Sequence, residues 1–597
     1  AGNKATETMT INVTDVDENH APTDIDLSHS RVAESTNGAV VGLLNTVDLD
    51  KNDKHTYQLE DATGKFEIVG GVLKLKDNQY LDYEVADNVT VKVTATDSTD
   101  KSYSKDFTID VLNQYEGVTN KTNNNTKLAD DDMPYFVNSQ FQQDIAYQAS
   151  TLNLWGHPQG YYHNEFDKIE NFIGKGRKIV YGFGNPNDQN PGIDGQHYTE
   201  TQKASVHKAM QQFAKQFNLD VEFNSNINNV DTDADVVFYR GSLGNYNSGG
   251  GETGRTEFYY TAISNGDYAP RSSKICVNTD AYGDGEDMSS GGAYQTLLHE
   301  IGHSVGLKHP FDDVAVLPTN ENNHDNTMMS YTGGKNGPIV DFRHFDIATL
   351  EYMYGLNDNY KSGSDTYKYG EQKIISDGGG DDVLDASAIS EDLTINLNPG
   401  SWCYTGDSQN KSVLADGQVF IGYDTMIESV STGSGDDYII ANTADSHARS
   451  GEGNDIIIGG KGDNSFLGEK GNDILSGAGG NDNLDAGDGN DVLIGGAGLD
   501  TLTGGAGKDI FVFDVLDGSV DDIKDFNISQ GDVLALDDDV FTALQGKTGD
   551  DIMNYIHYDR GTGQVSYDSD GSGSNTAVTF ADVGTALDLT AHNILIV

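Results

Sequence analysis

The sequence predicts a multidomain chain in which an all-β sandwich, a mixed α/β domain and a parallel β-roll follow one another. The 597 residues are too many for one hydrophobic core. Short alternating runs broken by Asn, Asp and Gly fill residues 23–112, and strand-like and helix-like patterns are mixed in residues 134–360. A strict nine-residue period then runs from residue 432 to 512, which is typical of a stacked, coiled architecture.

Changes of composition divide the chain into six expected segments. Residues 1–22 would hold the last strand and linker of a preceding repeat, and because a lone strand is not stable we expect a fragment or a processed product. We then expect a sandwich at 23–115, a polar linker at 116–135, the α/β domain at 136–375, the β-roll at 376–515 and a β-rich cap at 516–597.

Hydrophobic periodicity predicts individual elements of the α/β domain. We expect strands at 178–183 and 233–239, a helix at 199–217 that Thr199 caps, a second helix that opens at Ser289 or Ser290, and a third at 346–354.

The charge of the chain excludes some classes of partner. Asp and Glu number 95 against 37 Lys and Arg, which gives a formal net charge of −58. Such a surface repels nucleic acid and anionic membranes, and no apolar run of about 18 residues exists that would insert into a bilayer. The 70 glycines gather late in the chain together with Asp, which indicates calcium as the counter-charge. Two cysteines exclude a disulfide scaffold and leave open whether Cys276 and Cys403 pair.

The stretch from His299 to Pro310 predicts a zinc site. His299 and His303 are four residues apart and share one face of a helix, and Glu300 lies beside the first of them. Gly306 can end the helix and turn the chain so that His309 returns as a third ligand. Three nitrogen ligands leave a fourth position for water, which is typical of a catalytic site. The alternative is a chance spacing of ordinary surface or core histidines.

The whole pattern resembles the metzincin zinc endopeptidases, and Pro310 after the last histidine resembles their serralysin branch. Downstream, Asn326–Tyr331 contains a Met-Ser-Tyr sequence that matches the turn beneath the zinc in serralysin-like enzymes. The resemblance implies that Met329 forms an apolar floor under the histidines and that Tyr331 ligates zinc or donates a hydrogen bond to the oxyanion. It also implies that Glu300 is the general base toward water at the metal. His324 is the one other histidine near enough in sequence to be a pocket candidate.

The nine-residue repeat places one acidic and one apolar residue in almost every unit. Position six holds Asp in seven of the nine units, with Ser446 and Asn464 as exceptions, and an isolated copy lies at 377–385. Position eight is always apolar: Ile439, Ala448, Ile457, Phe466, Leu475, Leu484, Leu493, Leu502 and Phe511. A flexible Gly-rich linker, the rival interpretation, does not explain this unbroken apolar position.

The repeat resembles the RTX nonapeptide β-roll, in which stacked turns share calcium ions. The calcium ligands that we expect are Asp382, Asp437, Gly451, Gly453, Asp455, Gly471, Asp473, Gly480, Asp482, Gly487, Gly489, Asp491, Gly496, Gly498, Asp500, Gly505, Gly507 and Asp509. RTX proteins are typically exported unfolded by a type I system with a C-terminal signal, and they fold where calcium is millimolar. The final Ile594–Val597 run is either the end of such a signal or a plain last strand.

The N-terminal sandwich resembles a cadherin-like repeat. The family's linker and DxD calcium ligands match Asp15, Asp17, Asp48, Asp50 and Asp97. The alternative is that these aspartates are solvated surface carboxylates.

Together these features predict a secreted, extracellular and calcium-stabilised zinc endopeptidase that cleaves proteins, acts as a monomer, and binds one catalytic Zn²⁺ and several structural Ca²⁺. The sandwich could hold the enzyme at a matrix or cell surface. The alternative function is a calcium-dependent bacterial adhesin whose protease-like domain is inactive or accessory.

Overall fold

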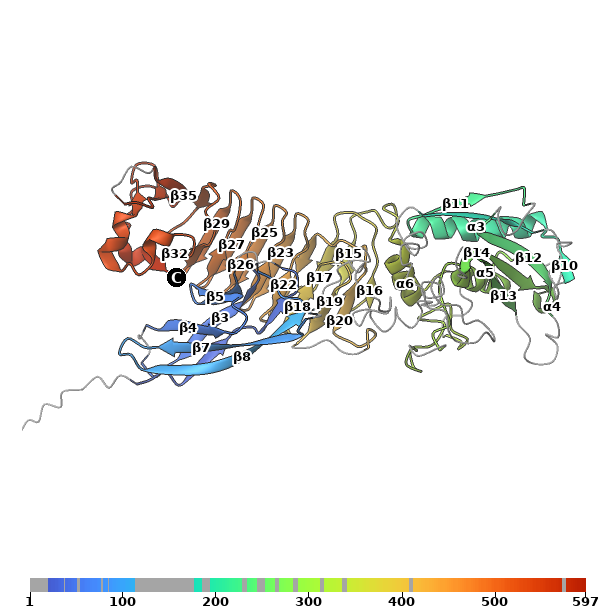
Figure 1. Ribbon diagram of the computed structural model, residues 1–597, viewed down its shortest axis with the longest axis horizontal. Helices are drawn as coiled ribbons and strands as arrows, with labels where there is room; N and C mark the ends of the chain where they lie inside the picture. Colours follow the sequence, from blue (N-terminus) through green and yellow to red (C-terminus); the bar gives the residue numbers. More distant parts are fainter. Residues whose placement is uncertain are drawn as a thin grey trace, which may run out of the picture.

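The protein is elongated, with the α/β domain at one end, the cap at the other and the sandwich alongside the roll between them (Figure 1). The computed structural model describes residues 20–36, 38–50, 54–76, 79–83, 85–112, 177–184, 194–227, 234–243, 253–262, 268–282, 288–311, 316–334, 341–406, 412–571 and 576–597. The strand that we expected within residues 1–22 lies outside these ranges, as does the expected linker at 116–135. None of the helices in these ranges is long and apolar enough to cross a bilayer.

The first domain is a β-sandwich of two four-stranded sheets with the orders β1-β3-β6-β5 and β2-β8-β7-β4. Its strands are β1 (Asp24–Leu27), β2 (Arg31–Ala33), β3 (Val40–Val47), β4 (Thr56–Asp61), β5 (Phe66–Val69), β6 (Val72–Leu75), β7 (Asn88–Thr96) and β8 (Ser102–Leu112). The predicted all-β sandwich is thus present. Strands β5 and β6 form a hairpin, because Gly70 and Gly71 take φ of 60° and 89° and reverse the chain.

The α/β domain packs helices against a twisted sheet of order β11-β9-β12-β14-β13, with β10 beside β12. Its elements are β9 (Arg177–Phe183), β10 (Asp194–Gln196), α3 (Glu200–Gln216), β11 (Leu219–Phe223), β12 (Val236–Ser242), β13 (Gly254–Ala262), β14 (Tyr268–Asn278), α4 (Thr279–Tyr282), α5 (Gly291–Ser304) and α6 (His344–Tyr354). Thr199 caps α3 as predicted. Strand β12 starts three residues later than expected, and α6 starts two residues earlier because the Asp346 carboxylate accepts the Arg343 N–H (2.9 Å).

Two sheets of eleven strands each form the roll and cap. The first sheet contains β15 (Thr366–Lys368), β17 (Val383–Asp385), β21 (Ser429–Ser431), β23 (His447–Glu452), β25 (Ser465–Lys470), β27 (Asn483–Asp488), β29 (Thr501–Ala506), β31 (Asp521–Ile523), β35 (Val578–Asp582), β34 (Gln564–Tyr567) and β33 (Ile556–Tyr558). The second contains β16 (Ile374–Ile375), β20 (Gln418–Ile421), β19 (Trp402–Thr405), β18 (Leu393–Asn396), β22 (Tyr438–Ile440), β24 (Ile456–Ile458), β26 (Ile474–Ser476), β28 (Val492–Ile494), β30 (Ile510–Phe513), β32 (Val533–Leu536) and β36 (Ile594–Ile596).

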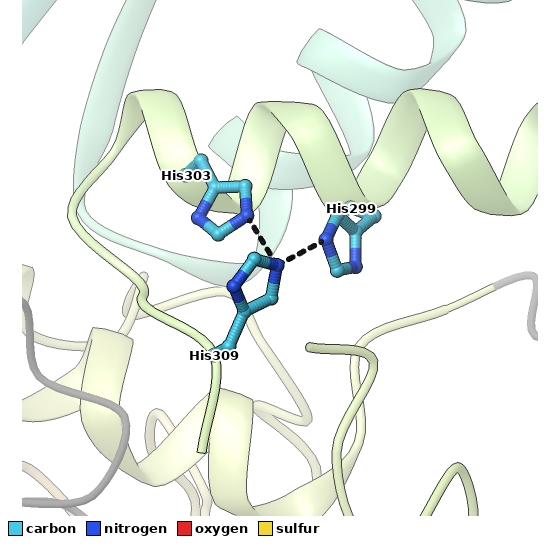
Figure 2. A group of neighbouring side chains, drawn as sticks. All are labelled: His299, His303 and His309. Atoms are coloured by element: carbon cyan, nitrogen blue, oxygen red, sulfur yellow. Dashed lines mark hydrogen bonds between the residues drawn. The ribbon is translucent and has the colours of Figure 1, made fainter. Parts of the chain in front are cut away.

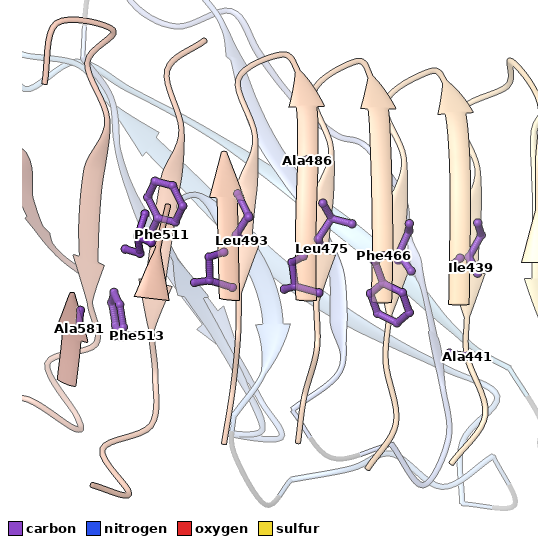
Figure 3. Close-up of a cluster of buried hydrophobic side chains, with 14 of the residues drawn as sticks. Ile439, Ala441, Phe466, Leu475, Ala486, Leu493, Phe511, Phe513 and Ala581 are labelled. Atoms are coloured by element: carbon purple, nitrogen blue, oxygen red, sulfur yellow. The ribbon is translucent and has the colours of Figure 1, made fainter. Parts of the chain in front are cut away.

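Successive coils of the roll are in register at an offset of 18 residues, or two repeats. Ile457 pairs with Leu475, for example, and Leu475 with Leu493. All nine position-eight side chains are buried, with at most 1% of their surface exposed, and they fill the space between the sheets (Figure 3). The sheets already begin at β15, before residue 376 where the roll was expected to start, and the C-terminal run forms strand β36 beside β32.

The two cysteines lie in different sheets. Cys276 on β14 and Cys403 on β19 are both buried, and no disulfide joins them. This answers the question that the sequence left open.

Candidate zinc and calcium sites

Helix α5 and the turn after it bring three histidines together. His299 and His303 project from one face of α5, which follows Ser290. The helix ends at Ser304, and Gly306, whose φ is 110°, then redirects the chain. The Leu307 N–H closes the turn on the Gly302 carbonyl (2.9 Å). His309 then returns toward the helix, as the sequence predicted (Figure 2).

The spacing of the three rings suits a tetrahedral metal. His309 Nε2 lies 3.2 Å from His299 Nε2 and 3.1 Å from His303 Nε2. Nitrogen ligands about 2.0–2.1 Å from a tetrahedral zinc ion lie roughly 3.3 Å from each other. These three nitrogens also form one of the groups within the described residues whose ligand atoms are close enough to hold a metal.

Backbone carbonyls fix the tautomers of the two helical histidines. His299 Nδ1 lies 3.0 Å from the Met328 carbonyl, and His303 Nδ1 lies 2.8 Å from the Leu307 carbonyl. A carbonyl only accepts, so each Nδ1 carries the proton and each Nε2 keeps its lone pair for a metal. Burial lowers the pKa of His299 to about 4 and that of His303 well below its usual value, which keeps both rings neutral.

Glu300 is buried beside the histidines and is held by a residue that the sequence did not reveal. The Thr256 hydroxyl on β13 donates to Glu300 Oε2 (2.7 Å). Gly254 on the same strand also lies close to the Glu300 carboxylate, since a Cβ at this glycine would be 2.8 Å from Glu300 Oε1. Strand β13 pairs only with β14 in the described sheet and packs against α5, so its other edge has no partner strand there.

The turn beneath the histidines is anchored from two sides. Met329 is fully buried, and a Cβ on Gly302 would lie 2.9 Å from its Sδ, so the glycine lets the sulfur pack against α5. Asp346 on α6 accepts hydrogen bonds from Met328 N and Thr327 Oγ1, both at 2.7 Å. Because the Met328 carbonyl in turn holds His299, Asp346 positions the site through the turn. Only the folded chain reveals this role.

Tyr331 lies over the third histidine at the mouth of the site. Its hydroxyl is 2.7 Å from His309 Nε2, and 68% of the residue's surface is exposed, so it can reach a bound ligand. Phe311 stacks on His309, with ring centroids 5.0 Å apart and planes 5° apart, and its ring also lies 5.0 Å from that of Tyr331. His324 does not join the cluster, and instead its Nε2 donates to the Ser330 carbonyl (2.6 Å).

The position-six aspartates of the roll each have one satisfied and one unsatisfied oxygen. Asp473 Oδ1, for example, accepts the Asp455 N–H, and Asp491 Oδ1 accepts the Asp473 N–H, both at 2.8 Å. The buried second oxygen has no hydrogen-bond partner in the described structure at Asp382, Asp437, Asp455, Asp473, Asp482, Asp491, Asp500 and Asp509. These are all eight aspartates that the sequence predicts as calcium ligands in the roll. A buried orphan carboxylate oxygen is what a hard cation requires, so the residues fit calcium.

Burial raises the pKa of these aspartates in the absence of a cation. The pKa rises to about 8 for Asp473 and to about 7 for Asp437, Asp482 and Asp491. Of the glycines predicted to contribute, Gly451, Gly453, Gly471, Gly480, Gly487, Gly496, Gly498, Gly505 and Gly507 take positive φ, and Gly489 does not. A Cβ on Gly498 would lie 1.7 Å from the Gly480 carbonyl oxygen, so the stacked turns leave no room for a side chain.

The aspartate rows continue beyond the strict repeat. Asp521 Oδ1 accepts the Asp500 N–H and Asp532 Oδ1 accepts the Asp509 N–H, both at 3.1 Å. At the other end Asp365 and Asp377 join Asp382, with ligand atoms within 4.8 Å of one another.

The aspartates predicted to bind calcium in the sandwich do not converge in this way. Asp15 and Asp17 lie outside the described residues. Asp48 pairs with His55 (3.0 Å), and Asp50 donates its N–H to Asp48 Oδ1 (3.0 Å). Asp97 has a buried Oδ2 without a partner in the described structure, but it is not part of either described group of potential metal ligands. Calcium binding here stays a prediction.

Comparison with known proteins matches both sites to families. Residues 192–332 match the matrixin family of M10 peptidases, and residues 431–466, 449–484 and 485–515 match the RTX calcium-binding nonapeptide repeat. Metallopeptidase AprA of Pseudomonas marginalis is 30% identical over 242 residues, which cover 34% of this chain and 48% of the relative. A serralysin of Photorhabdus laumondii is 31% identical over 187 residues, covering 25% and 37%, and serralysin C of Dickeya chrysanthemi is 30% identical over 181 residues, covering 24% and 36%.

The chain thus spans about half the length, or less, of these curated relatives. The matrixin domain implies a catalytic zinc ion, and the RTX repeats imply structural calcium ions. The chain thus contains a matrixin domain and RTX repeats, and about a quarter of it is similar to serralysins.

Proposed function

We propose that this chain is an extracellular zinc endopeptidase that hydrolyses proteins and is stabilised by calcium. The observation that carries the proposal is the convergence of three Nε2 atoms, two of them fixed as metal-binding tautomers, beside a buried carboxylate. His299, His303 and His309 would hold the zinc, with Tyr331 as a fourth group within reach. Bound there, zinc would supply Lewis-acid activation of water and of the peptide carbonyl.

The chain's own residues then move the protons. Glu300 takes a proton from water as its oxygen adds to the carbonyl carbon, and it gives the proton to the departing amine nitrogen as the C–N bond breaks. Thr256 holds Oε2 of Glu300 during this exchange, which keeps the orientation of the carboxylate fixed. The Tyr331 hydroxyl donates to the carbonyl oxygen as negative charge develops on it, a stabilisation of roughly 3 kcal/mol by analogy with other oxyanion donors.

An extended peptide is the substrate that the edge of β13 favours. The outer edge of β13 has no partner strand in the described structure and runs beside α5, so a substrate backbone can pair with it.

Cleavage of a protein such as casein tests the proposal. Treatment with 1,10-phenanthroline should abolish cleavage and added zinc should restore it. Full activity of the zinc-free protein would refute the proposed function.

We further propose the division into catalytic domain (136–375), roll (376–515) and cap (516–597), a monomeric state, and export by a type I system that leaves folding until calcium is met. The orphan aspartate oxygens support calcium-dependent folding, because without cations they destabilise the folded roll.

Attachment of the sandwich to a matrix or cell surface would use the outer face of the β2-β8-β7-β4 sheet. Removal of residues 1–115 should lower binding to insoluble substrate and leave peptide cleavage unchanged at saturating calcium.

A further inference from the structure

The outer faces of the two roll sheets differ in polarity, although the nine-residue repeat does not require this difference. Positions seven and nine of each unit point outward. In the second sheet these positions are apolar in all but one case: Tyr438, Ile440, Ile456, Ile458, Ile474, Val492, Ile494, Ile510 and Val512, with Ser476 as the exception. In the first sheet they are mostly polar: His447, Arg449, Ser465, Asn483, Asp485, Thr501 and Thr503, with Leu467 as the exception. The apolar pattern therefore recurs every 18 residues, and the nine apolar side chains of the second sheet form one outer face, hereafter the docking face.

The N-terminal sandwich covers the docking face. Val72 on β6 belongs to the same hydrophobic cluster as Ile456, Ile474 and Val492, and all four have at most 2% of their surface exposed. Figure 1 shows the sandwich strands lying along the roll. Strand β6 alternates, with Leu73 and Leu75 in the sandwich core and Val72 and Lys74 toward the roll.

The hairpin turn of the sandwich meets the far end of the same face. A Cβ on Gly70 would lie 3.4 Å from Ile510 and 3.7 Å from Val512, which is ordinary contact distance. Ala33, Val40 and Val69 complete the sandwich side of the cluster. The contact thus runs along several coils.

Polar contacts fix the register of the two parts. Lys74 Nζ pairs with Asp514 just after β30, and only 2% and 6% of the two side chains are exposed. The Tyr438 hydroxyl donates to the Val40 carbonyl (3.3 Å), and Arg31 donates to the Thr394 hydroxyl. Separating a buried ion pair leaves a buried charge without its partner, which is strongly destabilising. Lys74 and Asp514 therefore favour this position of the sandwich on the roll over a shifted one.

Each strand of the docking face directly follows an aspartate with an orphan oxygen. Asp437, Asp455, Asp473, Asp491 and Asp509 precede β22, β24, β26, β28 and β30. The aspartate turns must form before the outward side chains line up. Without calcium the buried carboxylates repel one another, which destabilises the docking face.

We propose that the N-terminal sandwich is an intramolecular partner of the calcium-loaded roll, and that docking and calcium binding are coupled. The sandwich binds only the assembled face, so docking raises the apparent calcium affinity of the repeats. By reciprocity, loss of calcium releases the sandwich. The docked sandwich then stabilises the folded roll and lowers the calcium concentration at which it folds, in addition to any role at a surface.

A calcium titration of the full chain tests the coupling. All variants carry Glu300→Gln so that the chain cannot digest itself, and folding of the roll is followed by far-UV circular dichroism. Val72→Asp places a charge on the sandwich side of the contact, and we expect the calcium midpoint to rise by about twofold or more. Thr90→Asp, which adds the same charge to an exposed position of β7 on the opposite sheet, should titrate like the parent.

A second pair of variants tests the roll side without disturbing the sandwich. Val492→Thr combined with Ile494→Thr copies Thr501 and Thr503, which the roll already carries at the same positions of its other sheet. This double variant should also raise the midpoint and speed hydrogen exchange in β26 and β28. Leu467→Thr, an apolar loss on the uncovered face, should change neither. A parent-like midpoint in the double variant would overturn the proposal, whatever Val72→Asp does.

Discussion

The hydroxyl of Thr256 on β13 donates a hydrogen bond to Oε2 of Glu300 on α5 across 2.7 Å. The same hydroxyl lies 2.9 Å from the Glu300 carbonyl oxygen. This contact joins the strand that can align a substrate to the carboxylate that moves its protons.

Replacing Thr256 tests whether this contact supports catalysis. Thr256→Val keeps the shape and removes the donor, and we expect kcat/KM to fall about tenfold, which corresponds to about 1.4 kcal/mol. Zinc content should not change, because Thr256 contacts none of the histidine nitrogens. Thr256→Ser keeps a hydroxyl and serves as the control. Equal activity in the Val and Ser variants would show that the hydrogen bond does not matter.

Asp346 should make the stability of the catalytic domain depend on pH. Burial raises its pKa to about 6, from 3.8, so the folded domain binds a proton more tightly than the unfolded chain does. The stabilisation from this proton is complete below about pH 4 and is lost as the pH rises through 6. Relative to Asp346→Asn, the native protein should therefore lose roughly 2–3 kcal/mol of stability between pH 4 and pH 7, as measured by chemical unfolding.

Asn is the matched control at this position. Its oxygen can accept from Met328 N and Arg343 N, and its amide can donate to Thr327 Oγ1. Asp346→Ala loses all three contacts and should cost about 2–4 kcal/mol of stability at any pH. A pH profile of Asp346→Asn identical to that of the native protein would contradict the assignment.

Asp473→Asn should change the stability of the roll in opposite directions with and without calcium. Asn keeps the oxygen that accepts the Asp455 N–H, as Asn464 does for Ser446 in the native chain, but it lacks the anionic orphan oxygen. With EGTA the variant should unfold at a higher temperature than the native protein, and at millimolar calcium it should unfold at a lower one. A shift of the same sign in both conditions would show that the orphan oxygen does not bind calcium.

Glycines of the roll should differ sharply in their tolerance of a side chain. In Gly498→Ala the new Cβ would meet the Gly480 carbonyl oxygen at 1.7 Å, so the coils must separate. We expect a loss of about 3 kcal/mol or more and a higher calcium midpoint. Gly518→Ala also has positive φ, at 97°, but nothing lies within 4 Å, so only about 1 kcal/mol of backbone strain should appear. Similar losses in the two variants would show that the clash is relieved without cost.

The zinc site was predictable because its signal is local. His299, His303 and His309 lie within eleven residues, and helix periodicity with one glycine turn suffices to bring them together. Thr256 and Asp346 were missed because they lie on other elements, 44 residues before Glu300 and 18 residues after Met328. No pattern in the sequence marks a lone Thr on an edge strand as a partner of a distant carboxylate.

The roll was predictable because its nine-residue period is strict, but the aspartates that lie beyond the last regular repeat were not. Asp521 and Asp532 continue the two rows at offsets of 21 and 23 residues instead of 18, so counting by nine does not reach them. The docking face was present in the sequence as alternate apolar and polar units at positions seven and nine. A comparison of neighbouring nine-residue units does not reveal this face, because its apolar residues recur only in every second unit.

The most direct test of the central claim is to measure zinc content and peptide hydrolysis together in Glu300→Gln at saturating calcium. The proposed mechanism predicts close to one zinc ion per chain, because the three histidines are untouched, and a loss of at least about 100-fold in casein cleavage, because no group remains to take the proton. Near-native cleavage by the zinc-loaded variant would contradict the account.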